Sequence, residues 1–117
     1  MQKKLNSMVL GPVIEWKSAR KKLCDSPLLQ KSILGAQTVE NVMNERSRSS
    51  GKRFLDIDIA SANNFLFIAD SALDGKCLDV AQTLYRHVLE VYIGSAYQAM
   101  RDRAMTGLNA IEIRRKK

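Results

Sequence analysis

Apolar residues recur every three or four positions through most of this chain, which is the spacing of one face of an α-helix. The strongest pattern runs from residue 61 to residue 103 and is interrupted by a polar turn at residues 74–76. This pattern predicts two antiparallel helices joined by that turn. We expect the second helix to begin near Cys77 and continue to about Ala104, with Gly94 as a point where it bends or packs closely.

Two more amphipathic helices are predicted in the first half of the chain. One starts at Gly11-Pro12, because proline fits the first turn of a helix. The next starts at Ser26, which is expected to cap it, with Pro27 at the first helical position, and ends near residues 44–46. Within it, Gly35 indicates close approach of a neighbouring helix. Its apolar face is expected to comprise Leu29, Ile33, Ala36, Val39, Val42 and Met43.

The connecting segments are more polar. Residues 45–53 are predicted to form a basic flexible linker, or alternatively a mobile loop that contacts phosphates or whose serines are phosphorylated. Residues 55–59 alternate apolar and acidic side chains, which is the period of a strand. Because a lone strand has nothing to pair with, residues 54–60 are assigned to the start of the next helix. Residues 105–117 are predicted to form a basic C-terminal tail.

These patterns predict an all-α protein, a small antiparallel bundle of three to four helices with a long central or C-terminal helix. The 117 residues, 45% of them hydrophobic, suit a single domain over residues 1–117. No apolar run reaches the ~18 residues that a membrane span requires. Since no secretory signal is recognised either, we expect a cytoplasmic or other intracellular protein.

The cysteines and the histidine, residue types that often bind metals or take part in catalysis, have no similar residues near them in the sequence. Cys24 and Cys77 have no neighbouring ligands, so we expect two reduced thiols, with a disulfide or a reactive thiol as the alternatives. His87 likewise stands alone and is expected at the surface or half-buried. We therefore predict no catalytic residues, no cofactor and no metal site, and do not expect an enzyme.

Charge divides the chain. The first 53 residues hold eleven Lys or Arg against four acids, whereas residues 54–104 hold four against seven, within a net charge of +7. This uneven distribution of charge favours an acidic protein surface, a nucleic acid or an anionic membrane as partner, and it does not select among them. The candidate contacts to phosphates are Lys17, Arg20, Lys21, Lys22, Arg46, Arg48, Lys52, Arg53, Arg114, Arg115, Lys116 and Lys117.

Residues 78–92 combine a small residue, an aromatic residue four positions later, and further aliphatic and aromatic residues after a glycine turn. They resemble the second helix of microtubule-interacting-and-transport (MIT) domains and of tetratricopeptide-like hairpins, over residues 61–103 in all. Val88 stands where these families usually have alanine, and no repeat of about 34 residues occurs elsewhere. The MIT resemblance implies a bundle whose groove binds an amphipathic segment of a partner.

On this reading the chain is a non-enzymatic helical protein–protein interaction module or adaptor, which binds a partner through an apolar groove on its C-terminal hairpin. The alternative is a small basic nucleic-acid-associated protein or a subunit of a ribonucleoprotein assembly. A homo-oligomer is left open. The predicted partner-binding residues are Leu84, Val88, Val91 and Ile93.

Overall fold

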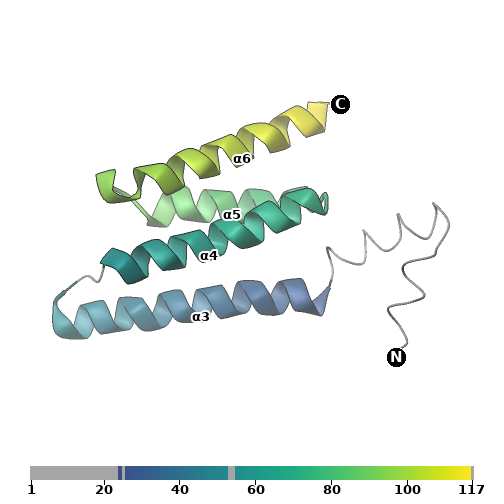
Figure 1. Ribbon diagram of the computed structural model, residues 1–117. Coiled ribbons are helices and arrows are strands. Elements are labelled where there is room, and N and C mark those ends of the chain that lie inside the picture. The colour runs from purple at the N-terminus through teal and green to yellow at the C-terminus, as the bar shows by residue number, and fades with distance from the viewer. Residues whose placement is uncertain (1–23, 25, 53–54, 117) are drawn as a thin grey trace.

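The computed structural model describes residues 24, 26–52 and 55–116. These residues form a small antiparallel all-α bundle, which confirms the predicted fold class (Figure 1). Helix α4 lies between α3 on one side and α5 and α6 on the other, and it packs against all three. The described elements are α3 (Pro27–Ser50), α4 (Leu55–Asp74), α5 (Leu78–Val91), the 3₁₀ helix η1 (Ser95–Tyr97) and α6 (Gln98–Lys116). The helix predicted from Gly11-Pro12 lies outside the described residues.

Local signals set both ends of α3. The Ser26 hydroxyl accepts a hydrogen bond from the Leu28 amide at 3.1 Å, and Pro27 begins the helix, as predicted. The predicted end near residues 44–46 is wrong, because residues 45–50 of the expected linker belong to α3. The helix stops only where Gly51 adopts a left-handed φ of 72° and donates its amide to the Ser47 carbonyl at 2.9 Å.

The predicted long helix is also corrected, because α5 ends at Val91 and the chain turns back into α6. Gly94, with φ 122°, adopts a conformation that side chains rarely allow, so the helix cannot continue through it. The Arg101 guanidinium donates to the Leu89 and Tyr92 carbonyls at 2.6 and 3.1 Å, which closes the exposed end of α5. Residues 105–116, predicted as a tail, therefore continue α6 and pack in the bundle.

The core lies where α4, α5 and α6 meet. Phe65 and Leu66 of α4, Tyr85 and Val88 of α5, and Ile111 of α6 are almost completely buried. Helix α6 crosses Tyr85 at Gly107, where an added Cβ would overlap the tyrosine ring. Glycine at this position therefore sets how closely α5 and α6 can pack.

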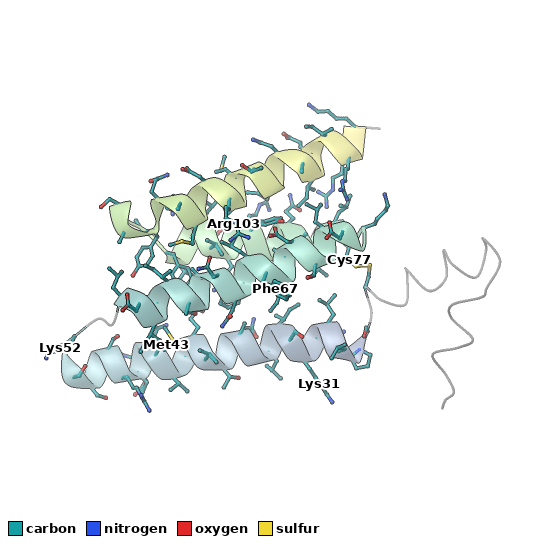
Figure 2. All side chains as sticks on the ribbon, viewed as in Figure 1. Lys31, Met43, Lys52, Phe67, Cys77 and Arg103 are labelled. Atoms are coloured by element: carbon teal, nitrogen blue, oxygen red, sulfur yellow. A yellow bond between two sulfur atoms is a disulfide. The ribbon has the colours of Figure 1, made fainter. Side chains whose placement is uncertain are left out.

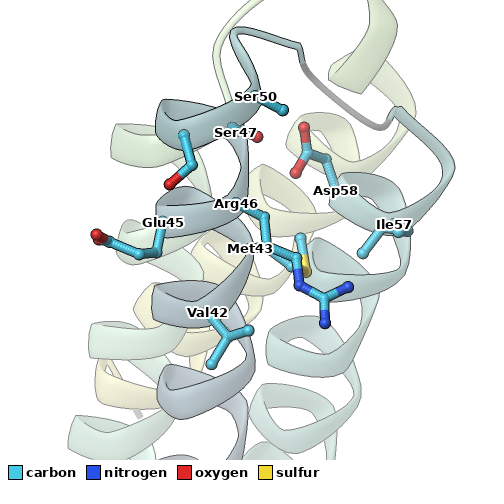
Figure 3. Close-up of a pocket in the computed structure, with 9 residues that line it drawn as sticks. Val42, Met43, Glu45, Arg46, Ser47, Ser50, Ile57 and Asp58 are labelled. Atoms are coloured by element: carbon cyan, nitrogen blue, oxygen red, sulfur yellow. The ribbon is translucent and has the colours of Figure 1, made fainter.

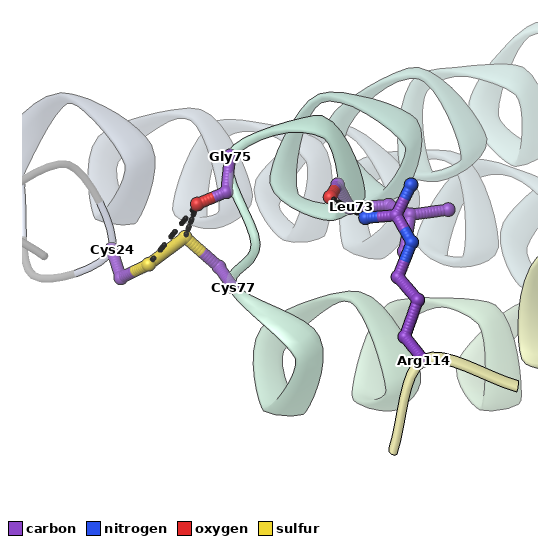
Figure 4. The surroundings of a disulfide bond; sticks show 5 residues. All are labelled: Cys24, Leu73, Gly75, Cys77 and Arg114. Carbon is purple, nitrogen blue, oxygen red and sulfur yellow. Dashed lines mark hydrogen bonds between the residues drawn. A yellow bond between two sulfur atoms is a disulfide. The ribbon is translucent and has the colours of Figure 1, made fainter. Parts of the chain in front are cut away.

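A disulfide between Cys24 and Cys77 corrects the expectation of two reduced thiols. It links the chain just before α3 to the predicted turn between α4 and α5, where the Gly75 carbonyl oxygen lies 3.9 and 3.7 Å from the two sulfurs (Figure 4). The two cysteines are 53 positions apart, so no local spacing indicates that they pair. Only the return of α4 along α3 brings them together.

Candidate functional site

Exposed apolar side chains concentrate on α3 and α4. Of the eleven large hydrophobic residues that are exposed in the described chain, seven lie on these two helices. Phe67 and Leu28 are 72% and 71% exposed, more than any of the others. Since the bundle core does not cover them, they form a surface available to a partner. The seven are Leu28, Leu34, Val39, Val42, Leu55, Ile57 and Phe67.

Helix α3 has two parallel stripes, each stepping by four and three residues, the spacing of a coiled-coil seam. The inner stripe is buried or half-buried against the bundle. The outer stripe is exposed throughout, so the single apolar face predicted for this helix is in fact divided. The inner stripe is Leu29, Ile33, Ala36, Glu40, Met43 and Ser47, and the outer α3 stripe is Leu28, Ser32, Gly35, Val39, Val42 and Arg46.

Helix α4 has a matching exposed stripe with the same spacing, the outer α4 stripe of Ile57, Ala60, Asn64, Phe67 and Ser71. The two outer stripes run along the line where α3 and α4 meet, which we call the groove and which is hollowed near each end. At one end, Val42 and Arg46 line a hollow of about 470 Å³ with Ile57 (Figure 3). At the other end, Leu28 and Ser32 line a hollow of about 150 Å³ with Ser71.

We call the surface made by the two outer stripes the α3–α4 face. Figure 2 shows the two helices side by side, with Met43 of α3 and Phe67 of α4 labelled. In Figure 3 the Arg46 side chain extends from α3 into the space between the helices. The face thus combines exposed apolar side chains with a few polar ones between them and charged groups near its ends, a composition suited to another helix.

Gly35 lies in the middle of this face. A Cβ added there would meet no atom within 4 Å, so packing among the described residues does not require glycine. Glycine inside a helix costs about 1 kcal/mol relative to alanine. The sequence predicts a neighbouring helix at this point, and no helix among residues 26–52 and 55–116 covers the α3–α4 face there.

Buried polar groups hold α3 in place. The Glu40 carboxylate accepts a hydrogen bond from the Tyr92 hydroxyl at 2.5 Å and lies 2.9 Å from His87 Nε2. Ser61 of α4 bonds to the same tyrosine hydroxyl at 2.7 Å. Burial, reinforced by the bond to Glu40, raises the pKa of Tyr92 well above its usual range, so its hydroxyl remains a donor. These bonds fix the orientation of α3 and keep its outer stripe turned outward.

Sequence reasoning missed Glu40. Its signal is a carboxylate on the inner stripe, at a position where Ala36 and Met43 are apolar neighbours. His87 is half-buried, as expected, but it has this partner rather than standing alone. The network is structural in character, because the Glu40 carboxylate and the Tyr92 and Ser61 hydroxyls are paired with one another within the bundle.

The predicted partner-binding residues of α5 are divided by the fold. Leu84 and Val88 are 4% and 0% exposed, which corrects their assignment as contacts, because the neighbouring helices bury this side of α5. Val91 and Ile93 are exposed at the end of α5. The MIT or tetratricopeptide resemblance stays a prediction, and the larger exposed apolar surface lies on α3 and α4 instead.

The candidate phosphate contacts that the structure describes form two groups at two ends of the molecule. Arg46, Arg48 and Lys52 lie toward the end of α3, and Arg114 to Lys116 end α6, at opposite ends of the bundle in Figure 1. Helix α4, about 30 Å long at 1.5 Å per residue, lies between the two groups. The remaining candidates, Lys17, Arg20, Lys21, Lys22, Arg53 and Lys117, lie outside the described residues.

Several of these cations already have partners within the bundle. Arg48 pairs with Glu45 at 2.7 Å. Arg114 donates to the Leu73 carbonyl at 2.8 Å, which closes the end of α4, and Arg115 pairs with Asp79 at 2.5 Å. The described cations therefore do not form one continuous basic surface.

Among the described residues, no three His, Cys, Asp or Glu side chains are placed to hold a metal ion, and no helix is long and apolar enough to cross a membrane. The chain matches no model of a known protein family, no curated protein and no solved structure.

Proposed function

We propose that this chain is a non-enzymatic helical interaction module and that its α3–α4 face binds a helical surface of a protein partner. The supporting observation is the pair of exposed stripes at coiled-coil spacing on adjacent helices. Exposed apolar side chains lie on both sides of the groove, on α3 and on α4. An amphipathic helix that enters the groove would place its own apolar residues between them.

Burial of this face would supply a useful driving force. Covering an exposed Val, Leu, Ile or Phe side chain contributes roughly 1.5–3 kcal/mol before the costs of association. Leu28, Val39, Val42, Ile57 and Phe67 are each at least 44% exposed, so several such contributions are available. The polar network around Glu40 favours binding further, because α3 is ordered before the partner arrives.

The alternative function, contact with nucleic acid, is supported by the net charge of +7. Fluorescence anisotropy with single-stranded and duplex oligonucleotides tests it directly. Binding that weakens steeply with salt and is lost on reversing Arg46 and Arg48 would favour this alternative over the interaction module.

The disulfide is relevant to the cellular compartment in which the protein works. Disulfides persist where thiols are oxidised and are rare where glutathione keeps them reduced. We therefore propose that the chain works in an oxidising environment, in place of the cytoplasmic or other intracellular location expected when no membrane span or secretory signal was recognised in the sequence. Alkylation of free thiols in the protein taken directly from its host, followed by mass measurement, tests this proposal, and two alkylated cysteines would contradict it.

Site-specific photocrosslinking tests the proposed binding face. A photoreactive amino acid at Val42, in the full chain expressed in its own host, should form crosslinks to a defined protein surface. The control position is Ile113 of α6, which is 59% exposed and lies away from the face. Equal crosslinking from both positions, or none from Val42, would reject the proposal.

A further inference from the structure

We propose that the partner on the α3–α4 face is a second copy of this chain, related by a two-fold axis that runs along the groove. This inference rests on the proposed function and identifies its partner. In such a dimer α3 of each copy lies on α4 of the other. The same patch then serves on both subunits, as two-fold symmetry requires.

Charge at the edges of the face supports this arrangement. Lys31 and Arg46 are exposed on α3, and Asp56 and Asp74 are exposed on α4. None of the four takes part in an ion pair with another described residue. Because the helices are antiparallel, Lys31 is near the end of the face where Asp74 lies, and Arg46 is near the end where Asp56 lies.

The charge pattern also distinguishes between the two possible two-fold axes. With an axis along the groove, each end of the face in one copy lies beside the same end of the face in the other copy. Lys31 of one copy then faces Asp74 of the other, and Arg46 faces Asp56. An axis across the groove would instead place α3 of one copy on α3 of the other, with the two helices running in opposite directions. Lys31 would then face Arg46, and like charges would meet. For these four groups, only the first arrangement is complementary.

The sizes of the side chains on the face also favour the axis along the groove. Ser32 and Ser71 line the same hollow and are therefore level with each other. One helical turn further along the groove, Phe67 of α4 is level with Gly35 of α3. The axis along the groove does not change the position of a residue along the groove, so Phe67 of each copy meets Gly35 of the other. A protruding ring thus faces the one position on α3 that has no side chain, which gives this glycine a role.

The area is also adequate. The 24 residues of α3 extend about 36 Å, and a face two helices wide measures about 20 Å, giving on the order of 700 Å². A standard interface covers about 800 Å² on each partner. The α3–α4 face is therefore large enough to support a dimer.

Sedimentation equilibrium of the full, oxidised chain tests the inference. We expect a species of twice the 13.2 kDa mass of one chain. Replacing Gly35 with Gln should weaken the dimer by about tenfold or more, because a longer side chain fills the space for Phe67. Circular dichroism should show an intact monomer, since a side chain at Gly35 meets nothing within the described chain.

Charge reversal supplies a second test that does not depend on Gly35. Lys31→Asp or Asp74→Lys alone should each weaken the dimer by about tenfold, since symmetry places two of these pairs in every dimer. The two substitutions together should restore the affinity. Ile113→Gln on α6 is the control and should leave the mass unchanged.

The outcomes separate this inference from the proposed function. A dimer that responds to Gly35→Gln and is restored by the double reversal supports the inference. A monomer at all concentrations, or a dimer insensitive to both tests, overturns it. If the chain is monomeric while Val42 still crosslinks to one identified protein of a different sequence, the dimer is rejected and the interaction module stands. If Val42 captures nothing either, both fail.

Discussion

The two halves of this bundle use their apolar residues in different ways. Helices α5 and α6 direct most of them into the core around Tyr85 and Ile111, and Gly107 lets the two helices approach closely. Helix α3 buries only three residues, Ala36, Glu40 and Ser47, and leaves four large hydrophobic side chains exposed. Its position depends instead on contact with α4, on the Glu40 hydrogen bonds and on the nearby disulfide. The difference indicates that α3 both completes the fold and presents a surface.

The largest expected contrast lies between two valines. Val88 is fully buried, so Val88→Asp should destabilise the fold by about 4 kcal/mol or more and leave much of the chain unfolded. Val42 is 49% exposed, and Val42→Asp should change the unfolding free energy of the monomer by no more than about 0.5 kcal/mol. Urea denaturation at a concentration where the chain is monomeric measures both. Similar losses for the two variants would show that the α3–α4 face belongs to the core.

Removal of the disulfide tests how α3 is held. Cys24→Ser with Cys77→Ser should lower the unfolding free energy by about 4 kcal/mol, because the disulfide closes a loop of 53 positions in the unfolded chain. The loss should be seen in denaturant titrations of oxidised wild type against the double variant. Reduced wild type is the matched control and should behave like that variant. If the unfolding free energy of the wild type does not change when its disulfide is reduced, the disulfide does not help to hold α3.

Local signals in the sequence were sufficient for part of this fold. The cap at Ser26, the first-turn proline and the turn at residues 74–76 were predicted because each depends on neighbouring residues. The break after Val91 was missed because apolar spacing continues from α5 into α6, although the chain reverses between them. A periodic pattern shows which residues share a face, and it does not show when one helix becomes two.

Features of longer range were not predictable in the same way. The pairing of Cys24 with Cys77 depends on how α3 and α4 lie together. Val39 and Val42 were assigned to the same apolar face as Leu29 and Ile33, yet they belong to the exposed outer stripe. A broad apolar face does not reveal how much of it the protein itself covers. Glu40 carried a readable signal, since a carboxylate among inward-facing positions requires partners.

The Glu40 network predicts a smaller but specific effect. Glu40→Ala should destabilise the protein by about 2 kcal/mol, because the buried Tyr92 hydroxyl and the half-buried His87 lose their acceptor. Glu45→Ala is the control on the same helix, since this side chain is 68% exposed, and it should cost no more than about 0.5 kcal/mol. Thermal unfolding of the two variants measures the difference. Equal effects would show that the buried bonds do not fix α3.

The finest test applies one substitution to two helical glycines. Gly35→Ala should stabilise the monomer by about 1 kcal/mol, because the new methyl group meets no atom and glycine is a poor helix former. Gly107→Ala should destabilise it by about 1–3 kcal/mol, since its methyl group overlaps the Tyr85 ring and must separate α5 from α6. Denaturant titration of both variants compares the signs. Opposite signs would establish that α6 needs its glycine for the fold and that α3 does not, whereas a loss at Gly35 would mean that the chain itself covers the α3–α4 face.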